Sequence, residues 1–143
     1  MIIQKMEIDH YAEVKRIWTT TDGMGLRSID DSKAGIEKFL LRNPNTNFIC
    51  KMDNSIVGVI LSGHDGRRGY IYHTAVKKEF RKQGIGKKLV EEAILSLRNE
   101  GINKVALVVF KNNSGGNSFW KALGFEERSD LIYRNLSLHA ENI

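Results

Sequence analysis

The feature that most constrains this chain is a glycine turn, rich in cations, that runs directly into an amphipathic helix. The stretch EFRKQGIGKKLV holds the turn around Gly84 and Gly86. Basic residues surround these glycines on both sides: Arg81, Lys82, Lys87 and Lys88. Apolar residues then recur at helical spacing as far as Leu97, and Gly101 supplies a stop signal. The pattern predicts a helix over 84–100 that begins in a cluster of positive charge.

Basic residues at the start of a helix are energetically unfavourable unless something offsets their charge. A helix N-terminus already carries about half a positive charge and unpaired N–H groups, so each lysine there costs a few tenths of a kcal/mol. A bound polyphosphate would make the same terms favourable. Gly84 and Gly86 lack a Cβ, so the backbone can curl tightly and present its N–H groups. We therefore predict a site for a compact anion.

The distribution of charge supports a small ligand over a nucleic acid. The whole chain has a net charge of +5, and residues 77–88, with six basic residues and one acidic residue, account for all of it. A nucleic-acid-binding protein spreads its cations over a face long enough to follow many phosphates. A small basic RNA-binding protein is therefore the less favoured hypothesis.

The remaining sequence predicts a mixed α+β fold in a single domain, 1–143. Helical spacing, alternation and turn signals divide the chain into segments. The expected elements are a strand at 2–8, helices at 9–21 and 33–43, an antiparallel meander at 46–76, a strand at 103–110, a helix at 114–125 and a final strand at 131–138.

Several classes of protein and site are disfavoured. No apolar run approaches the roughly 18 residues of a membrane span, and the first residues are too charged for a signal peptide, so we expect a cytoplasmic protein with no membrane partner. Cys50 is the only cysteine and lies in an apolar stretch, which predicts a buried structural thiol. The four histidines lack metal-ligand spacing, and we predict no metal.

Two motifs together carry a family resemblance. AVKKEFRKQGIGKKLVEEAI resembles the acyl-CoA pyrophosphate motif of the GNAT superfamily of N-acetyltransferases, and NNSGGNSFWKALGF is similar to the second motif of that family. The order of the expected elements also matches, most closely over 56–125. The resemblance implies a mostly antiparallel central sheet of about six to seven strands, flanked by about four helices. A homodimer is compatible with the family.

The resemblance also implies acetyl-CoA as cosubstrate and assigns residues to it. The cofactor pyrophosphate is expected on the backbone amides of one turn, namely Gln83, Gly84, Ile85, Gly86 and Lys87, with Arg81 and Lys82 near its charge. The strand end Thr74, Ala75 and Val76 is expected to pair with the pantetheine arm, and the Val76 N–H to serve as oxyanion donor. Asn113 matches the asparagine that contacts the pantetheine in the family.

One position departs from the family pattern. Many members place a tyrosine in the second motif helix to protonate the departing thiolate, whereas this chain has Trp120. An indole N–H cannot give up its proton, so Trp120 is expected either along the pantetheine or in the core. Tyr133, on the expected last strand, is the reserve candidate for the acid.

The general base has two candidates on the strand before the turn, Tyr72 and His73, although a core or hairpin side chain is the favoured interpretation of each. Simple alternation puts Tyr70 and Tyr72 on one face and His73 on the other, but a bulge, common in the family, would reverse the sides locally.

The predicted function is transfer of an acetyl group from acetyl-CoA to a primary amine by direct attack in a ternary complex. Trp120 motivates an alternative, a non-catalytic acyl-CoA-binding sensor on the same fold. The sequence leaves the acceptor open between a protein N-terminus, a lysine side chain, a polyamine, an aminoglycoside and an amino acid.

Overall fold

The expected antiparallel meander forms the centre of a five-stranded sheet in a computed structural model that describes all 143 residues. The strands follow one another in the order β1 (Ile2–Lys5), β2 (Phe48–Met52), β3 (Ser55–His64), β4 (Gly69–Val76) and β5 (Val105–Ala106). Neighbours pair antiparallel except β4 and β5, which run parallel. Asp53 and Asn54 join β2 to β3 with φ of 48° and 66°, the positive values that a tight type I′ hairpin turn requires.

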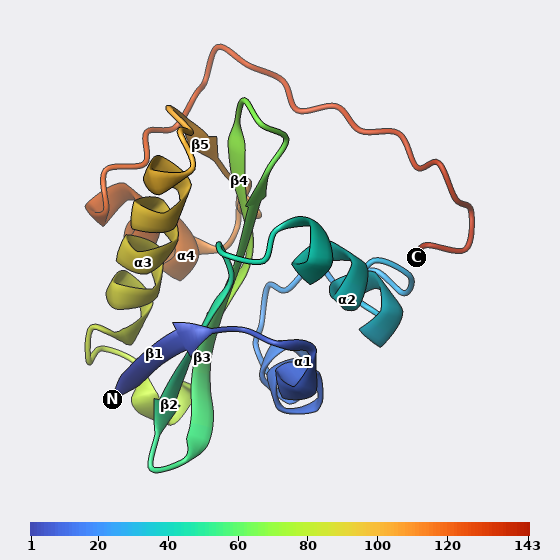
Figure 1. Cartoon of the computed structure of the whole chain (residues 1–143). Helices are drawn as coiled ribbons and strands as arrows, with labels where there is room; N and C mark the ends of the chain where they lie inside the picture. The colour runs from blue at the N-terminus through green and yellow to red at the C-terminus, as the bar shows by residue number, and fades with distance from the viewer.

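Four helices cover the two faces of this sheet (Figure 1). They are α1 (Tyr11–Thr19), α2 (Lys33–Arg42), α3 (Ile85–Asn99) and α4 (Ser114–Ala122), with short 3₁₀ turns η1 (Ile8–His10) and η2 (Lys78–Phe80). The helices α1 and α2 lie on one face, and α3 and α4 lie on the other. None of the helices combines the length and apolar character that crossing a membrane would require.

Strand β3 is buried on both faces, which explains its nearly continuous apolar sequence. Val59 packs with Val14 and Trp18 of α1, whereas Val57 packs with Leu89 of α3. The sheet therefore separates two apolar clusters, one beneath each pair of helices.

Gly58 of β3 lets the start of α3 approach the sheet closely. A Cβ atom at this position would lie 3.0 Å from Leu89 Cδ1 and 3.1 Å from Ile85 Cγ2, closer than a well-packed core allows. The glycine thus helps to set the position of the helix whose first turn carries the cations.

Replacing this glycine with alanine tests the packing. We expect Gly58→Ala to lower the free energy of unfolding by about 1–2 kcal/mol, because the added methyl group overpacks the contact with α3. The matched control is Gly115→Ala, where a Cβ would meet no atom within 4 Å and where alanine favours the helix. Urea denaturation followed by circular dichroism measures both changes. Equal stability of Gly58→Ala and the original chain would contradict the role given to this contact.

Two expectations about strands are wrong. The sheet has five strands instead of six to seven, because residues 131–138 are extended and fully exposed and pair with no other strand, and only Val105 and Ala106 of the expected strand 103–110 pair with β4. The parallel pairing ends at Tyr70 and Ala106, after which residues 107–110 leave the edge of β4. The mixed α+β class, the meander and the four helices are confirmed, although the first expected helix divides into η1 and α1.

Candidate active site

The end of the β4–β5 pairing leaves one edge of β4 free over its last residues. Lys77 N–H donates to Val57 O at 2.8 Å, toward β3. Because successive N–H groups of a strand point to opposite edges, the N–H groups of Val76 and Thr74 point toward the free edge. An extended ligand could pair there as an added strand.

A bulge in β4 decides which side chains face the same side of the sheet. The register moves from Ile60 opposite Thr74 to Ser62 opposite Ile71, so Leu61 faces two residues, Tyr72 and His73. Tyr72 contacts Phe39 of α2, and His73 contacts Trp18 of α1, with ring centroids 5.5 Å and 5.1 Å apart. The two candidate bases therefore share the face covered by α1 and α2, whereas simple alternation would have separated them.

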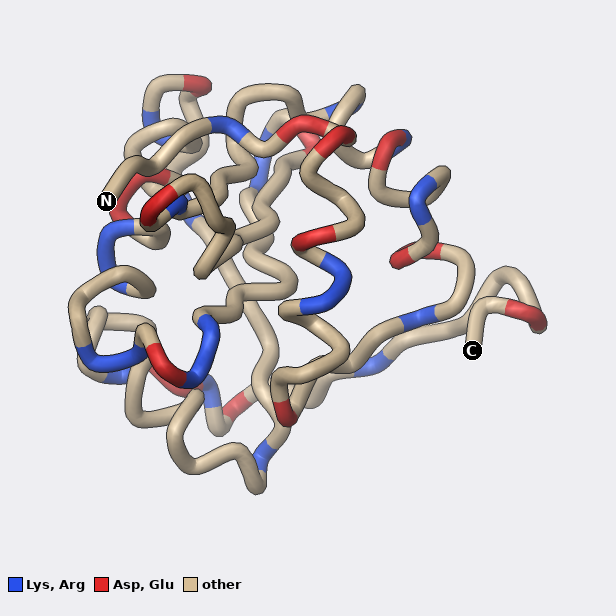
Figure 2. Tube along the Cα trace, turned by 90° about the horizontal axis from the view of Figure 1, so that it is seen from below, with Lys and Arg blue, Asp and Glu red and all other residues tan.

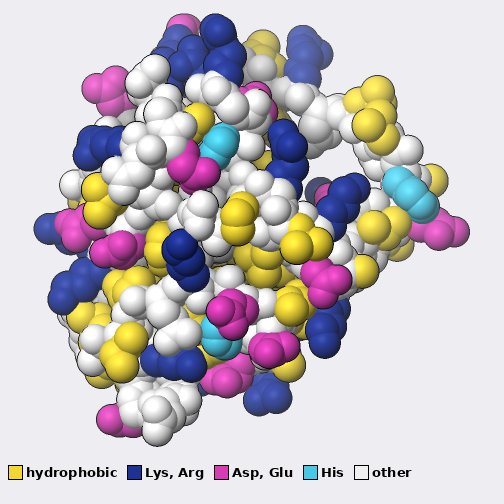
Figure 3. Space-filling model, viewed as in Figure 1, with side chains coloured by type: hydrophobic (Ala, Val, Ile, Leu, Met, Phe, Trp, Pro, Cys, Tyr) yellow, Lys and Arg dark blue, Asp and Glu magenta, His cyan; other side chains and the backbone are white.

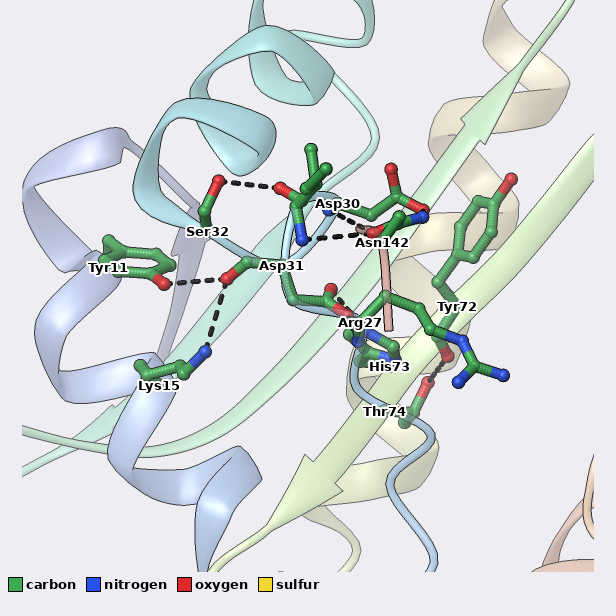
Figure 4. A network of polar contacts seen from close by, with 11 residues as sticks. Tyr11, Lys15, Arg27, Asp30, Asp31, Ser32, Tyr72, His73, Thr74 and Asn142 are labelled. Carbon is green, nitrogen blue, oxygen red and sulfur yellow. Dashed lines mark hydrogen bonds and ion pairs between the residues drawn. The ribbon is translucent and has the colours of Figure 1, made fainter. Parts of the chain in front are cut away.

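His73 is held by a buried carboxylate. Its Nε2 lies 2.6 Å from Asp31 Oδ1, and the Asp31 residue is only 5% exposed. The backbone N–H of Arg27 donates to the other oxygen, Asp31 Oδ2, at 2.6 Å, and the Tyr11 hydroxyl donates to Asp31 O at 2.7 Å. Figure 4 shows these groups converging from α1, the loop before α2 and β4.

The hydrogen bonds keep Asp31 ionised. Burial alone would raise its pKa, but hydrogen bonds from the His73 ring and the Arg27 N–H, with the positive charges of His73 and Lys15, outweigh that effect and lower the pKa below its usual value. An ionised Asp31 can only accept, so Nε2 of His73 carries the hydrogen. When the ring carries no second proton, Nδ1 holds a lone pair, and no protein group is hydrogen-bonded to Nδ1.

Tyr72 and Tyr133 lie near each other but are not hydrogen-bonded to each other. Burial raises the pKa of Tyr72 first, and the charges of Tyr133 and Asp30 raise it further. Tyr133 itself is 65% exposed and belongs to the unpaired residues 131–138. The reserve acid is therefore near the candidate bases, on a segment that the sheet does not fix.

The glycine turn presents a row of unused backbone donors. Lys82 and Gly84 have φ of 60° and 80°, and this left-handed backbone curls the turn into a concave nest. The N–H of Lys88 is the first in α3 to find a partner, Gly84 O at 3.1 Å. The backbone N–H groups of residues 82–87 have no hydrogen-bond acceptor within the protein.

The basic side chains of the turn are nearly all without an ion-pair partner as well. Of the six basic residues in 77–88, only Lys87 forms an ion pair, with Glu91 at 3.9 Å. Figure 2 shows how basic and acidic residues are distributed over the whole chain. Arg81 Nε donates to Val76 O at 2.9 Å, so the turn and the free end of β4 are tied together. The terminal nitrogens of Arg81 remain available to an anion.

The second motif borders an open cleft at the start of α4. Asn113 Oδ1 accepts a hydrogen bond from the Gly116 N–H at 2.9 Å and thereby caps α4. Asn113 also lines a cleft of about 520 Å³. The other lining residues are Asp22, Gly23, Phe110, Asn112, Ser114 and Gly115.

Trp120 belongs to an aromatic cluster. Its ring lies edge to face with Phe119 and Phe125, at centroid distances of 5.0 Å and 5.1 Å, and packs partly buried against the α3 side of the core. The structure shows this core packing, and the placement of Trp120 along the pantetheine stays a prediction.

Asp31 is the site residue that the sequence analysis missed. It stands in a polar segment, 22–32, that reads as a solvated loop, and nothing in the local sequence marks one aspartate as buried. Asp30, next to it, is exposed. The helix N-cap at Ser32, whose hydroxyl accepts from Gly35 N–H at 3.1 Å, fixes the loop end and could have indicated that Asp31 is held rigidly.

Comparisons with known proteins identify the family of this chain. The model of the acetyltransferase (GNAT) family matches residues 11–125, a range that includes the bulged strand, the glycine turn and α4. The chain belongs to the GNAT family. It is therefore an acetyltransferase.

Known relatives and solved structures align with most of this chain. Acetyltransferase plu1384 of Photorhabdus laumondii is 30% identical over 128 residues, which are 90% of this chain and 88% of that protein. The crystal structure of Ard1 from Thermoplasma volcanium matches with a TM-score of 0.78 at 23% identity, covering 87% of this chain and 82% of the other. The PaiA N-acetyltransferase of Thermoplasma acidophilum, in complex with coenzyme A, matches at 0.75 with 22% identity, covering 87% and 89%.

The buried carboxylate makes stability depend on pH. We expect Asp31→Asn to lower the free energy of unfolding at pH 7 by about 1–3 kcal/mol, because the ring and backbone donors lose a charged acceptor. The folded-state pKa of Asp31 is lowered, so its stabilisation is complete above the unfolded value of about 3.9 and is lost as the pH falls through the folded value. The loss in Asp31→Asn should therefore shrink toward pH 3.

Urea denaturation at pH 7 and pH 3 measures this difference. The exposed Asp9, which makes no side-chain hydrogen bond or ion pair, supplies the control Asp9→Asn, expected to be within about 0.5 kcal/mol of the original at both pH values. A loss in Asp31→Asn that is the same at both pH values would show that the charge of Asp31 does not stabilise the fold.

Proposed function

We propose that this chain, acting as a single cytoplasmic domain over 1–143, transfers an acetyl group from acetyl-CoA to a primary amine. One observation carries the proposal: six consecutive unpartnered N–H groups, those of residues 82–87, lie in a nest beside the free edge of β4 and among unpaired cations. A diphosphate next to an extended amide-containing arm matches both features. Coenzyme A combines these two groups in one molecule.

The pyrophosphate would bind in the nest. Backbone N–H groups of the turn would donate to its oxygens, and the positive end of α3 would favour its charge. The terminal nitrogens of Arg81 and the ammonium of Lys82 would lie close to that charge. The donors concerned are those of Gln83, Gly84, Ile85, Gly86 and Lys87.

The pantetheine arm would lie along the free edge of β4. The backbone of Thr74, Ala75 and Val76 would pair with its amides, and α4 with Asn113 and Trp120 would border its other side. The Val76 N–H, which already points away from β3, would donate to the thioester carbonyl as negative charge develops on that oxygen.

His73 is the proposed general base, with Asp31 as the residue that orients it. Nδ1 would take a proton from the amine, directly or through a water molecule that Tyr72 could help to order, and Asp31 would stabilise the resulting imidazolium. The amine nitrogen attacks the carbonyl carbon, the C–N bond forms as the C–S bond breaks, and the thiolate takes up a proton. That last proton could come from solvent or from Tyr133.

Direct attack in a ternary complex fits the position of the only cysteine. Cys50 is fully buried in β2, and burial raises the pKa of its thiol, with only a partial offset from nearby positive charges. A buried, protonated thiol is a poor nucleophile. An acetyl-cysteine intermediate is therefore not part of the proposed mechanism.

The turn can be tested with two glycines of the same backbone conformation. Gly84 and Gly101 each have φ of 80°, and a Cβ at either position would meet nothing within 4 Å, so Gly84→Glu and Gly101→Glu carry similar backbone penalties. We expect Gly84→Glu to weaken acetyl-CoA binding by roughly 100-fold or more, because a carboxylate would face the pyrophosphate. Gly101→Glu, at the other end of α3, should bind as the original does.

Isothermal titration calorimetry with acetyl-CoA compares the three proteins, and circular dichroism confirms that each is folded. If Gly84→Glu bound acetyl-CoA as tightly as Gly101→Glu, the pyrophosphate would have to be placed elsewhere.

The base can be tested by its effect on the pH profile. We expect His73→Gln to lower kcat by about 100-fold or more and to remove the fall in rate on the acidic side, because the group that must be unprotonated is gone. The control is His64→Gln, which alters a partly buried histidine paired with Glu100 at 3.3 Å, away from the turn. Steady-state thiol release over a range of pH, with a panel of primary amines, provides the measurement. An acidic limb that persists in His73→Gln would exclude His73 as the base.

A further inference from the structure

Residues 141–143 are bonded to the loop before α2, from which they are distant in the sequence. Six hydrogen bonds join them to Ser28, Ile29 and Asp30. Three of these bonds come from one side chain. Asn142 Oδ1 accepts from the N–H groups of Ile29 and Asp30 at 3.0 Å and 3.1 Å, and Asn142 Nδ2 donates to Asp30 Oδ2 at 2.8 Å. Figure 4 shows Asn142 bonded to the loop from which Asp31 reaches His73.

The contact at 141–143 is local. No hydrogen bond or ion pair joins residues 126–140 to any part of the chain before them. Figure 1 shows these residues as an arc that leaves α4 and returns to the loop before α2, and Figure 3 shows a gap between the arc and the body of the molecule. Holding the far end of such an arc costs conformational entropy, which the six hydrogen bonds must offset.

The contact supplies acceptors that the loop lacks. Residues 28–32 contain no proline and therefore have five backbone N–H groups. Two of these donate to carbonyls of the loop itself, those of Arg27 and Ile29, at 3.1 Å and 3.2 Å. The other three donate to Asn142 and Ile143. Without these two residues, most of the loop's donors would have only water as a partner, and the loop would be free to change shape.

The shape of this loop decides where the Asp31 carboxylate points. Bonds from α1 reach only the main-chain carbonyl of Asp31 and leave its side chain free to rotate. Within the chain, the carboxylate is held only by the Arg27 N–H and the His73 ring. The Arg27 N–H and the Asp31 side chain close a ring through residues 28–30, which are the residues that Asn142 and its neighbours hold. A change of shape at 28–30 therefore turns the carboxylate away from His73.

We propose that Asn142 is a positioning residue for the general base. It holds residues 28–30 in the shape that keeps Asp31 directed at Nε2 of His73, so the ring stays oriented and the imidazolium it becomes is stabilised. The effect of Asn142 on the ring is independent of the proposed function. Its effect on the rate rests on that function, because it acts only if His73 is the base.

Exchanging two side chains tests the contact. Asn142→Ala removes all three bonds of the side chain. Asn142→Asp keeps an acceptor for the two N–H groups but places a second carboxylate against Asp30, so it should also release the loop. Adding Asp30→Asn to Asn142→Asp exchanges the amide and the carboxylate and should restore the contact. The control is Asn135→Asp, which adds the same charge to an exposed residue that has no side-chain hydrogen bond or ion pair.

The ring can be observed by proton NMR without any ligand, since a ring N–H exchanges with water too quickly to be seen unless a hydrogen bond protects it. We expect a His73 Nε2–H signal at pH 7 in the original, the exchanged pair and Asn135→Asp, assigned by its loss in His73→Gln. In Asn142→Ala and Asn142→Asp it should be at least about five-fold weaker. No signal in the original, an undiminished signal in Asn142→Ala, or no recovery in the exchanged pair would overturn the proposal.

Turnover gives a second readout. Asn142→Ala should lower kcat by about ten-fold and leave KM for acetyl-CoA within about two-fold, because the base is misplaced while the glycine turn is untouched. The acidic limb of its pH–rate profile should move to lower pH, because the imidazolium loses its carboxylate partner. The titratable groups that face this pair are Tyr11 and Lys15 of α1, Asp30 of the loop and Tyr72 of β4. A merely structural role would lower the rate without moving the limb, and that result would overturn the positioning.

The two readouts separate this proposal from the proposed function. If the NMR signal follows Asn142 as expected but His73→Gln keeps its full rate, the base lies elsewhere, and the control of the ring by Asn142 stands. Circular dichroism confirms that each variant is folded. If Asn142→Ala does not fold, the comparison of Asn142→Asp with the exchanged pair decides the proposal by itself, and equal signals in these two proteins would overturn it.

Discussion

The early end of the pairing between β4 and β5 is the constraint on which the rest of the site depends. After Tyr70 and Ala106 the two strands share no further pairs, so the last residues of β4 keep one free edge in the middle of an otherwise hydrogen-bonded sheet. Free strand edges are normally covered or paired. Here the free edge ends at the glycine turn, and Arg81 Nε donates to the carbonyl of Val76, so that the proposed anion site and the proposed strand-pairing site meet at one point. If β5 had paired with β4 over its full length, this edge of β4 would not be free to pair with a ligand.

The second determinant is the single extra residue in β4. Without the bulge, Tyr72 and His73 would face opposite sides of the sheet, and only one of them could approach α1 and α2. With it, the histidine reaches Asp31 from the sheet while Tyr11 and Arg27 hold the same residue from the helix and the loop. The orientation of the ring is thus fixed by groups from three segments that are distant in the sequence, which is how an enzyme fixes a tautomer without a metal or a second histidine.

A structural feature could be predicted from the sequence where neighbouring residues determine it, and could not be predicted where it depends on contacts between distant segments. The helix α3 and the tight glycine turn at its start were predicted correctly, because turn chemistry and helical spacing depend on neighbouring residues. The meander was predicted for the same reason. The burial of Asp31 could not be predicted, since it depends on α1 and β4 closing over the loop. The strand at 131–138 was predicted from its alternation, but alternation describes what a segment can pair with and does not supply a partner within the chain.

The position of Cys50 gives this protein an internal reporter of core opening. The only thiol lies at the centre of the sheet and is inaccessible, with Gly58 opposite it on β3. A thiol reagent in solution can therefore react only with molecules in which the core between α3 and the sheet has opened, and the rate of modification follows the population of that open state. Any molecule that binds the folded chain slows this reaction in proportion to its occupancy, whichever amine or cofactor it is. The chain's one cysteine, which has no part in the proposed mechanism, can thus reveal ligands that a turnover assay would miss.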